Sequence, residues 1–318
     1  MFYLYIKQPC THPASIASCL HQLKTAIVIL KIILTAIIFS LSRSFSPYLQ
    51  KPLLYHPLFK GRGISLNVTA FPVENIPLIK PGDDIAQLLC ERTQLKEHDI
   101  VVISSTIVSK SEGRIVSLNN IKQTERAKTI ARRNKTEPGF VQAVLDQSTE
   151  VLLESPFLLV RINNGSICVN AGIDHSNVEG SNNIVLLPEN PDKSALELKK
   201  KIFEYSGKTV SVIITDTNGR AFRIGQTGAA LGCAGIKPLR DWRGTKDLFG
   251  RVLEVKNEAV IDEIAGFANI LMGEGDGGTP IVILSGMGLY DESYGIQDLF
   301  RPEKEDVIRS AILKSQSI

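Results

Sequence analysis

The sequence predicts a mixed α/β fold (α/β with α+β character) that begins near residue 63. Apolar runs rich in β-branched residues, such as Ile100–Ile103 and Val212–Thr215, alternate with segments of helical period. With 43% hydrophobic and 22% charged residues, the 318-residue chain can bury a sizeable core. We find no 20–50-residue repeat and no low-complexity tract.

The first elements expected along the chain are a strand over 64–73, a turn-rich loop over 76–84 and a helix over 85–93. Asp83 or Asp84 can cap this helix. A short strand over 100–103 then runs into small polar residues and Lys110. Helices are expected over 124–135 and 140–149, and two strands around an Asn-Gly turn over 157–172.

The second half continues the alternation. An amphipathic helix over 195–207 ends at Gly207, which favours a left-handed cap. The buried strand over 208–220 breaks into polar residues at its end, and the Arg-rich stretch 218–244 is unusually dense in glycine for a solvated face. The last elements expected are a strand over 248–255, a helix over 258–272 and a strand over 280–287.

The first 62 residues form an N-terminal extension of different composition. Residues 1–73 contain seven basic side chains and no acidic one, so the rest of the chain has 29 basic and 33 acidic side chains. A mildly acidic body gives no support for nucleic-acid binding. The five cysteines are widely spread, which argues against a disulfide framework or zinc site and indicates a reducing compartment.

Residues 25–41 are a candidate membrane segment, since 13 of the 17 are apolar. Lys31 lies inside the run, where a charge costs roughly 2.5–3.5 kcal/mol on insertion scales. An anchor, a start assigned upstream of the true one and a cleaved targeting peptide all remain open. Each alternative allows the body to lie in the cytoplasm, joined through a Pro-rich linker over 46–63.

Acidic residues follow apolar segments at three places. Asp216 comes directly after an apolar run, Asp174 follows a strand and a Gly172 turn, and Glu274 with Asp276 lies in the glycine-rich stretch 272–280. Separated carboxylates of this kind suit Mg²⁺ or Mn²⁺. Divalent ions between acids and phosphates would explain carboxylates in a phosphate-type glycine loop. A turn cap at Asp216, a helix cap at Asp174 and a plain surface loop are the alternatives.

Basic residues supply two further candidates. The first is Lys110. The second is a group of five arginines that could bind acidic substrates or form surface ion pairs with Asp241 or Asp247. This group consists of Arg220, Arg223, Arg240, Arg243 and Arg251.

Several of these motifs together resemble the coenzyme F420-0:L-glutamate ligases, also called γ-glutamyl ligases. The matching segments are IPLI (76–79), SSTIVSK (104–110), NAGIDHSN (170–177), ITDTNGR (214–220) and MGEGDGGTP (272–280). Their order and spacing agree from about residue 64 to about residue 290, and the extension over 1–62 has no counterpart.

The resemblance implies a two-domain γ-glutamyl ligase-like fold over 63–318 that forms an intertwined homodimer. It also implies GTP as co-substrate and two Mg²⁺ or Mn²⁺ ions, with a monovalent cation as a further candidate. Lys110 and Asp216 would be catalytic. Metal would be held by Asp174, Asp216, Thr217 and Glu274. The nucleotide would contact Ile76, Pro77, Leu78, Ile79, Ser105, Lys110, Asn177, Met272, Gly273, Gly275, Asp276, Gly277, Gly278 and Thr279.

The implied reaction joins L-glutamate to a terminal carboxylate through an acyl phosphate. The acceptor would be F420-0, an acidic deazaflavin, and the alternative is a folate-type pterin acceptor. A further alternative, from another class, is a membrane-tethered nucleotide-binding protein without ligase activity. The intact acids at 174, 216 and 274 argue against this last alternative.

Overall fold

The structure is a computed structural model that describes residues 67–315. The extension with its candidate membrane segment 25–41 therefore lies outside the described residues. The described residues belong to one compact unit. Within residues 67–315, none of the helices has the length and apolar character needed to cross a bilayer.

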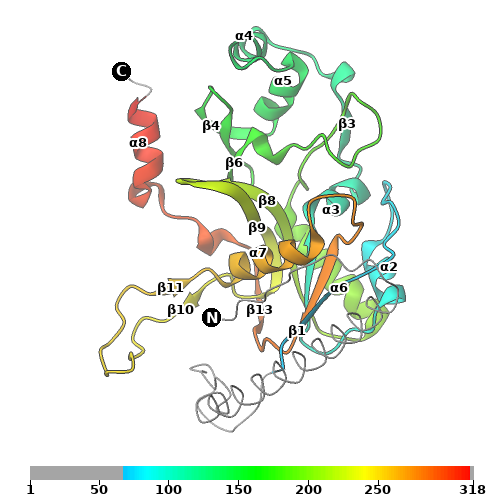
Figure 1. The fold of residues 1–318 in the computed structure, drawn as a ribbon, viewed down its shortest axis with the longest axis vertical. Helices are drawn as coiled ribbons and strands as arrows, with labels where there is room; N and C mark the ends of the chain where they lie inside the picture. The colour runs from blue at the N-terminus through cyan, green and yellow to red at the C-terminus, as the bar shows by residue number, and fades with distance from the viewer. Residues whose placement is uncertain (1–66, 316–318) are drawn as a thin grey trace, which may run out of the picture. The chain divides into compact units, whose positions relative to one another are not determined.

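A six-stranded mixed sheet forms the centre of this unit (Figure 1). The strand order is β1-β12-β2-β8-β9-β13, and only the β2–β8 pair is parallel. The strands are β1 (Thr69–Pro72), β2 (Ile100–Ser104), β8 (Ser211–Arg220), β9 (Arg223–Ile236), β12 (Ile281–Ser285) and β13 (Tyr290–Tyr294). The last residues of β8 and the first of β9 extend beyond the sheet as a long curved hairpin.

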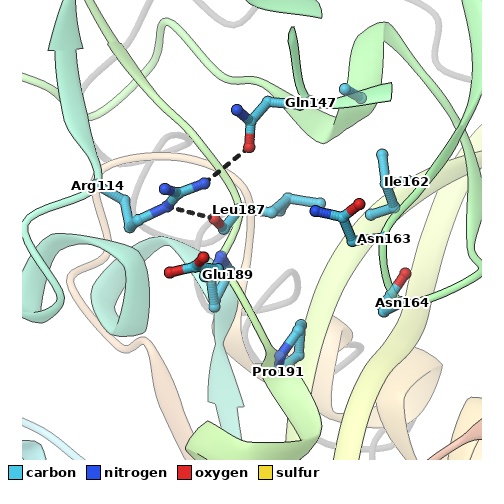
Figure 2. Close-up of a pocket in the computed structure, with 10 residues that line it drawn as sticks. Arg114, Gln147, Ile162, Asn163, Asn164, Leu187, Glu189 and Pro191 are labelled. Carbon is cyan, nitrogen blue, oxygen red and sulfur yellow. Dashed lines mark hydrogen bonds between the residues drawn. The ribbon is translucent and has the colours of Figure 1, made fainter. Parts of the chain in front are cut away.

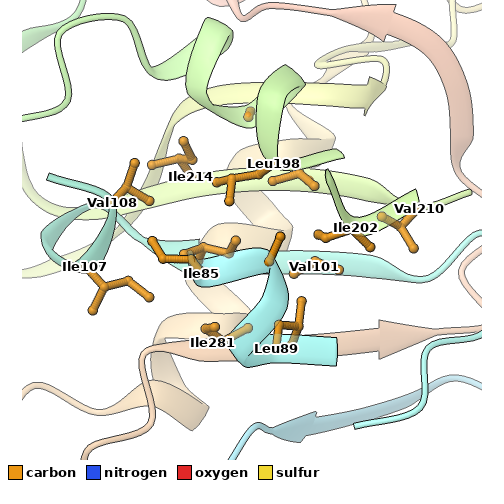
Figure 3. Close-up of a cluster of buried hydrophobic side chains, with 14 of the residues drawn as sticks. Ile85, Leu89, Val101, Ile107, Val108, Leu198, Ile202, Val210, Ile214 and Ile281 are labelled. Carbon is orange, nitrogen blue, oxygen red and sulfur yellow. The ribbon is translucent and has the colours of Figure 1, made fainter. Parts of the chain in front are cut away.

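Helices cover both faces of the sheet. Because successive side chains on a strand point to opposite faces, Val101 and Ile103 pack with α2 (Ile85–Arg92) and α6 (Pro191–Ser206), as Figure 3 shows for part of this cluster. Ile100 and Val102 pack instead with α7 (Val260–Met272). The result is three layers around two buried clusters.

A smaller lobe is inserted between β2 and α6, with its own buried cluster from α4, α5, β5 and β7. It contains the two-stranded ribbon β3 (Ile115–Ser117) with β7 (Asn183–Val185), the three-stranded sheet β4 (Ser148–Leu153), β5 (Leu159–Ile162) and β6 (Ile167–Val169), and the helices α4 (Glu125–Asn134) and α5 (Pro138–Asp146). Leu231 from β9 enters this cluster and connects the lobe to the large sheet.

The remaining elements are short. They are α3 (Ser105–Ser111), β10 (Arg240–Asp241), β11 (Asn257–Glu258), α8 (Val307–Ser315) and the 3₁₀ turns η1 (Leu118–Asn120), η2 (Asn170–Gly172), η3 (Gln297–Leu299) and η4 (Glu303–Glu305).

Most predicted elements are confirmed. Asp84 caps α2 by accepting from the backbone N–H groups of Ala86 and Gln87. Gly207 ends α6 at φ 65°, and Gly165 lies at φ 95° in the turn between β5 and β6. Periodicity and cap chemistry are local, which explains why they could be read from sequence.

One predicted element is absent, and two segments for which no element was predicted form regular structure. Residues 105–111 form the helix α3, although they follow a β-branched run. Residues 223–236, which belong to the Arg- and Gly-rich stretch, form the long strand β9. Its glycines are needed for close packing, since a Cβ on Gly232 would lie 2.4 Å from the carbonyl carbon of Pro191. The strand predicted over 248–255 is absent, and only an isolated bridge joins Lys246 to Val252 there.

Candidate functional site

A cavity of about 500 Å³ lies where β2 and α3, the η2–β7 connection, β8 and the α7–β12 loop come together. It brings together residues from four separated motifs. Of the residues predicted for metal and nucleotide, its wall contains Ile76, Pro77, Leu78, Ile79, Lys110, Asp174, Asn177, Asp216, Thr217, Met272, Gly273, Glu274, Gly275, Asp276, Gly278 and Thr279.

Asp216 lies within β8, one residue after the point where Leu231 bulges out of the facing strand. The strand predicted over 208–220 includes this aspartate, which the structure confirms, and the bulge lies just before it. Ser105 donates a hydrogen bond from Oγ to Asp216 Oδ1 at 3.0 Å. Burial raises the pKa of Asp216 to about 6, and the like charges of Asp174 and Glu274 act in the same direction.

Asp174 is presented by the left-handed turn η2. Asn170, Ala171 and Gly172 all have positive φ, and a Cβ on Gly172 would lie 2.6 Å from Leu187 Cδ1. The backbone of Asp174 then bridges to Val185 of β7, with N···O distances of 3.1 and 2.9 Å. Its carboxylate accepts from the N–H and hydroxyl of Ser176.

Glu274 lies in the exposed glycine loop between α7 and β12. Asn269 Nδ2 donates to Glu274 Oε1 at 2.9 Å, and Thr217 Oγ1 donates to Oε2 at 3.3 Å. Thr279 closes the base of the loop by donating from Oγ1 to the Met272 carbonyl at 3.0 Å. The carboxylate is thus held by α7 and β8 as well as by its own backbone.

Lys110 supplies the positive charge of the cavity wall. Its side chain is nearly buried, and Nζ donates to the carbonyl oxygen of Asn177, a residue at φ 53°. Burial lowers the pKa of Lys110, while the nearby Asp174 carboxylate acts in the opposite direction.

The donor set of the cavity suits a hard cation. Asp174, Asp216 and Glu274 raise the local negative charge, and the ion pairs found among residues 67–315 include none of the three. In the same part of the chain, no three His, Cys, Asp or Glu side chains already converge as a ligand set. Hydrogen bonds to Ser176, Asn269 and Thr217 hold two of the carboxylates instead.

Some predicted residues lie elsewhere. Ser105 bonds to Asp216 but does not line the cavity, and Gly277 does not line it either. None of the five arginines proposed for acidic substrates contributes to this wall. Arg240 pairs with Glu258 at 3.2 Å and Arg243 with Asp241 at 2.6 Å.

Sequence reasoning also missed part of the wall. Thr106 and Ile107 reach the cavity because residues 105–111 coil into α3, which the β-branched run concealed. Asn269 also lines it, and its signal was available: a lone amide between apolar residues of a helix, five residues before Glu274.

A second cavity, of about 120 Å³, lies under the lobe (Figure 2). Arg114 donates from Nε to the Leu187 carbonyl at 3.1 Å and from Nη2 to Gln147 Oε1 at 2.7 Å. Asn164 donates to the Leu231 carbonyl and accepts from the Ser166 N–H. The Arg114 bonds join segments of the lobe to one another, and the Asn164 bond to Leu231 joins the lobe to strand β9 of the large sheet.

Comparison with known proteins assigns the chain. The profile of the family F420-0:Gamma-glutamyl ligase matches residues 74–286. The chain is 51% identical over 247 residues to the coenzyme F420:L-glutamate ligase of Archaeoglobus fulgidus, covering 78% of this chain and 98% of the relative. Identity to the Methanosarcina mazei enzyme of the same name is 52% over 245 residues, with 76% and 96% covered. The chain therefore belongs to the F420-0:γ-glutamyl ligase family.

Proposed function

We propose that this protein is a GTP- and metal-dependent ligase that adds L-glutamate to the terminal carboxylate of coenzyme F420-0. One observation carries the proposal beyond family membership. Lys110, Asp174, Asp216 and Glu274, which come from four separate motifs, line a single cavity next to the glycine loop. The relatives' names supply the acceptor and the amino acid.

The reaction needs an activated acyl group, because joining a carboxylate to an amine in water is unfavourable. The γ-phosphoryl group of GTP passes to the F420-0 carboxylate and gives an acyl phosphate. The glutamate amine then attacks the carbonyl carbon, the C–O bond to phosphate breaks, and the amine proton leaves to solvent. The products are the amide, GDP and phosphate.

The cavity residues position charge for these steps. Two divalent ions held by Asp174, Asp216, Glu274 and Thr217 would neutralise phosphate oxygens and stabilise the charge of the transition state. Lys110 adds an ammonium fixed by the Asn177 carbonyl. The residues Ile76–Ile79 provide an apolar wall on which a nucleotide base can lie.

The exposed apolar residues of two projecting segments support the expected homodimer. Phe222 and Ile224 at the β8–β9 hairpin tip, and Phe249 and Val255 between β10 and β11, are at least 90% exposed in the single chain. Large apolar side chains grouped on extended arms favour pairing with a second copy. A mass of one chain in light scattering would contradict this assembly.

The function is tested with the full-length protein, GTP, Mn²⁺ and L-glutamate. F420-0 and a folate ending in glutamate are supplied separately as acceptors, and products are analysed by mass. We expect F420-0 to gain a glutamate with stoichiometric GDP. Transfer to the folate alone would favour the alternative acceptor. GTP binding without any product would favour the alternative of a nucleotide-binding protein without ligase activity.

A further inference from the structure

The position of Glu274 is poorly determined by its own loop. Gly273, Gly275, Gly277 and Gly278 surround it, and the loop is exposed. A Cβ placed on Gly273, Gly275 or Gly278 would have no neighbour within 4 Å. Glycine backbone with few contacts has many accessible conformations, so another group must hold the carboxylate.

Asn269 is that group on α7. Its amide Nδ2 donates to Glu274 Oε1 at 2.9 Å, and the residue itself lines the cavity. The contact from Thr217 to Oε2 is longer, at 3.3 Å. Because Asn269 is neutral and its Nδ2 is a donor only, it orients the carboxylate without repelling or competing for a cation.

The packing of α7 fixes Asn269 relative to the acids on β8. A Cβ on Gly228 would lie 2.4 Å from the Ala265 carbonyl oxygen and 3.0 Å from Asn269 Cβ, so helix and strand are in close contact there. Gly228 is the direct partner of Thr217 in the β8–β9 pairing, and Ala229 is the partner of Asp216. Helix α7 therefore packs against the part of β9 that pairs with the predicted metal ligands Asp216 and Thr217 of β8.

We propose that Asn269 is a positioning residue that holds Glu274 in place for a divalent ion. The inference rests on the proposed function only in requiring that the ion binds at Glu274. Outer-shell partners of ligating carboxylates typically contribute 10–100-fold to metal affinity, roughly the range expected here.

The test compares Asn269→Ala, the isosteric Asn269→Leu and Asn269→Gln, which keeps an amide donor. Asn134→Ala is the matched control, because Asn134 also loses a donated bond (2.7 Å, to the Glu154 carbonyl) but lies on α4 in the lobe. Mn²⁺ affinity of the full chain is measured by electron paramagnetic resonance with a non-hydrolysable GTP analogue. Thermal unfolding of each variant is recorded alongside.

We expect the Ala and Leu variants to bind Mn²⁺ roughly 10–100-fold more weakly. Asn269→Gln should recover part of the loss, and Asn134→Ala should bind as the wild type does. In turnover, the Mn²⁺ concentration for half-maximal rate should rise while kcat at saturating Mn²⁺ changes little. Wild-type Mn²⁺ affinity in both Asn269→Ala and Asn269→Leu overturns the inference alone, whereas failure of the wild type to bind Mn²⁺ overturns the metal-dependent function with it.

Discussion

The two cavities differ in how their polar groups are satisfied, although segments 110–114 and 171–174 contribute to both. In the small cavity, Arg114 bonds to backbone and amide groups of the lobe, and Asn164 bonds to the Leu231 carbonyl and so ties the lobe to the sheet. In the large cavity, three carboxylates, those of Asp174, Asp216 and Glu274, line the same wall, and burial together with like charge raises the pKa of Asp216 to about 6. Buried carboxylates of like charge with a raised pKa lower the stability of the fold, and such an arrangement is typical of a ligand site.

The largest expected effect is the loss of ligation when Asp216 is replaced. Asp216→Ala should lower the rate by at least about 10³-fold, because a predicted metal ligand is removed from the transition-state site. Stability should be unchanged or higher, since a buried carboxylate among like charges is removed. Product mass and thermal unfolding measure the two quantities. Full activity at ordinary Mn²⁺ concentrations would reject the assignment of Asp216.

Lys110→Met should reduce kcat by roughly 10²-fold while the protein stays folded. The apolar replacement keeps most of the side-chain volume and removes the ammonium that donates to the Asn177 carbonyl. Steady-state kinetics and circular dichroism provide the measurements. A variant with wild-type kcat would remove Lys110 from the catalytic group.

Arg114→Met should show the opposite pattern. It removes two hydrogen bonds from a charged donor, so the free energy of unfolding should fall by about 2 kcal/mol, with activity within about threefold of wild type. Urea denaturation gives the first quantity. Arg133→Met on α4 is the control and should change neither quantity much, because it removes only an exposed ion pair to Glu154 at 3.6 Å. A large loss of activity in a stable Arg114 variant would break the distinction between the cavities.

Asp84 is a carboxylate that, unlike Asp216, has enough hydrogen-bond donors to favour its charged form. Partial burial acts to raise its pKa, but hydrogen bonds from Lys201, the Gln87 N–H and Tyr205 lower the pKa below its ordinary value of 3.8. The stabilisation is therefore present above pH 3.8 and is lost as the pH falls through the lower folded-state value.

Asp84→Ala should reduce the free energy of unfolding by about 1 kcal/mol at pH 7, through loss of the α2 cap. The difference in the free energy of unfolding between variant and wild type should become smaller as the pH falls below 3.8. Urea denaturation over this pH series checks the direction. A difference that grows on acidification would contradict the sign of the pKa shift.

Much of the fold could be predicted from signals carried by neighbouring residues. The parts that depend on contacts remote in sequence could not. The Asp84 cap and the Gly207 stop depend on adjacent residues. Strand β9 could not be recognised, because its glycines make contacts with α6 and α7 that are remote in sequence. For the candidate site, motif resemblance located the acids, but the hydrogen bonds from Asn269 to Glu274 and from Ser105 to Asp216 join separate elements and appear only in the fold.

The most direct test of the account is a crystal structure of the full chain with Mn²⁺ and a non-hydrolysable GTP analogue. Anomalous scattering locates the manganese ions. We predict ions within about 2.0–2.6 Å of carboxylate oxygens of Asp174, Asp216 and Glu274, the range for hard divalent cations. Manganese and triphosphate bound elsewhere, with these carboxylates free of metal, would contradict the assignment of this cavity as the active site.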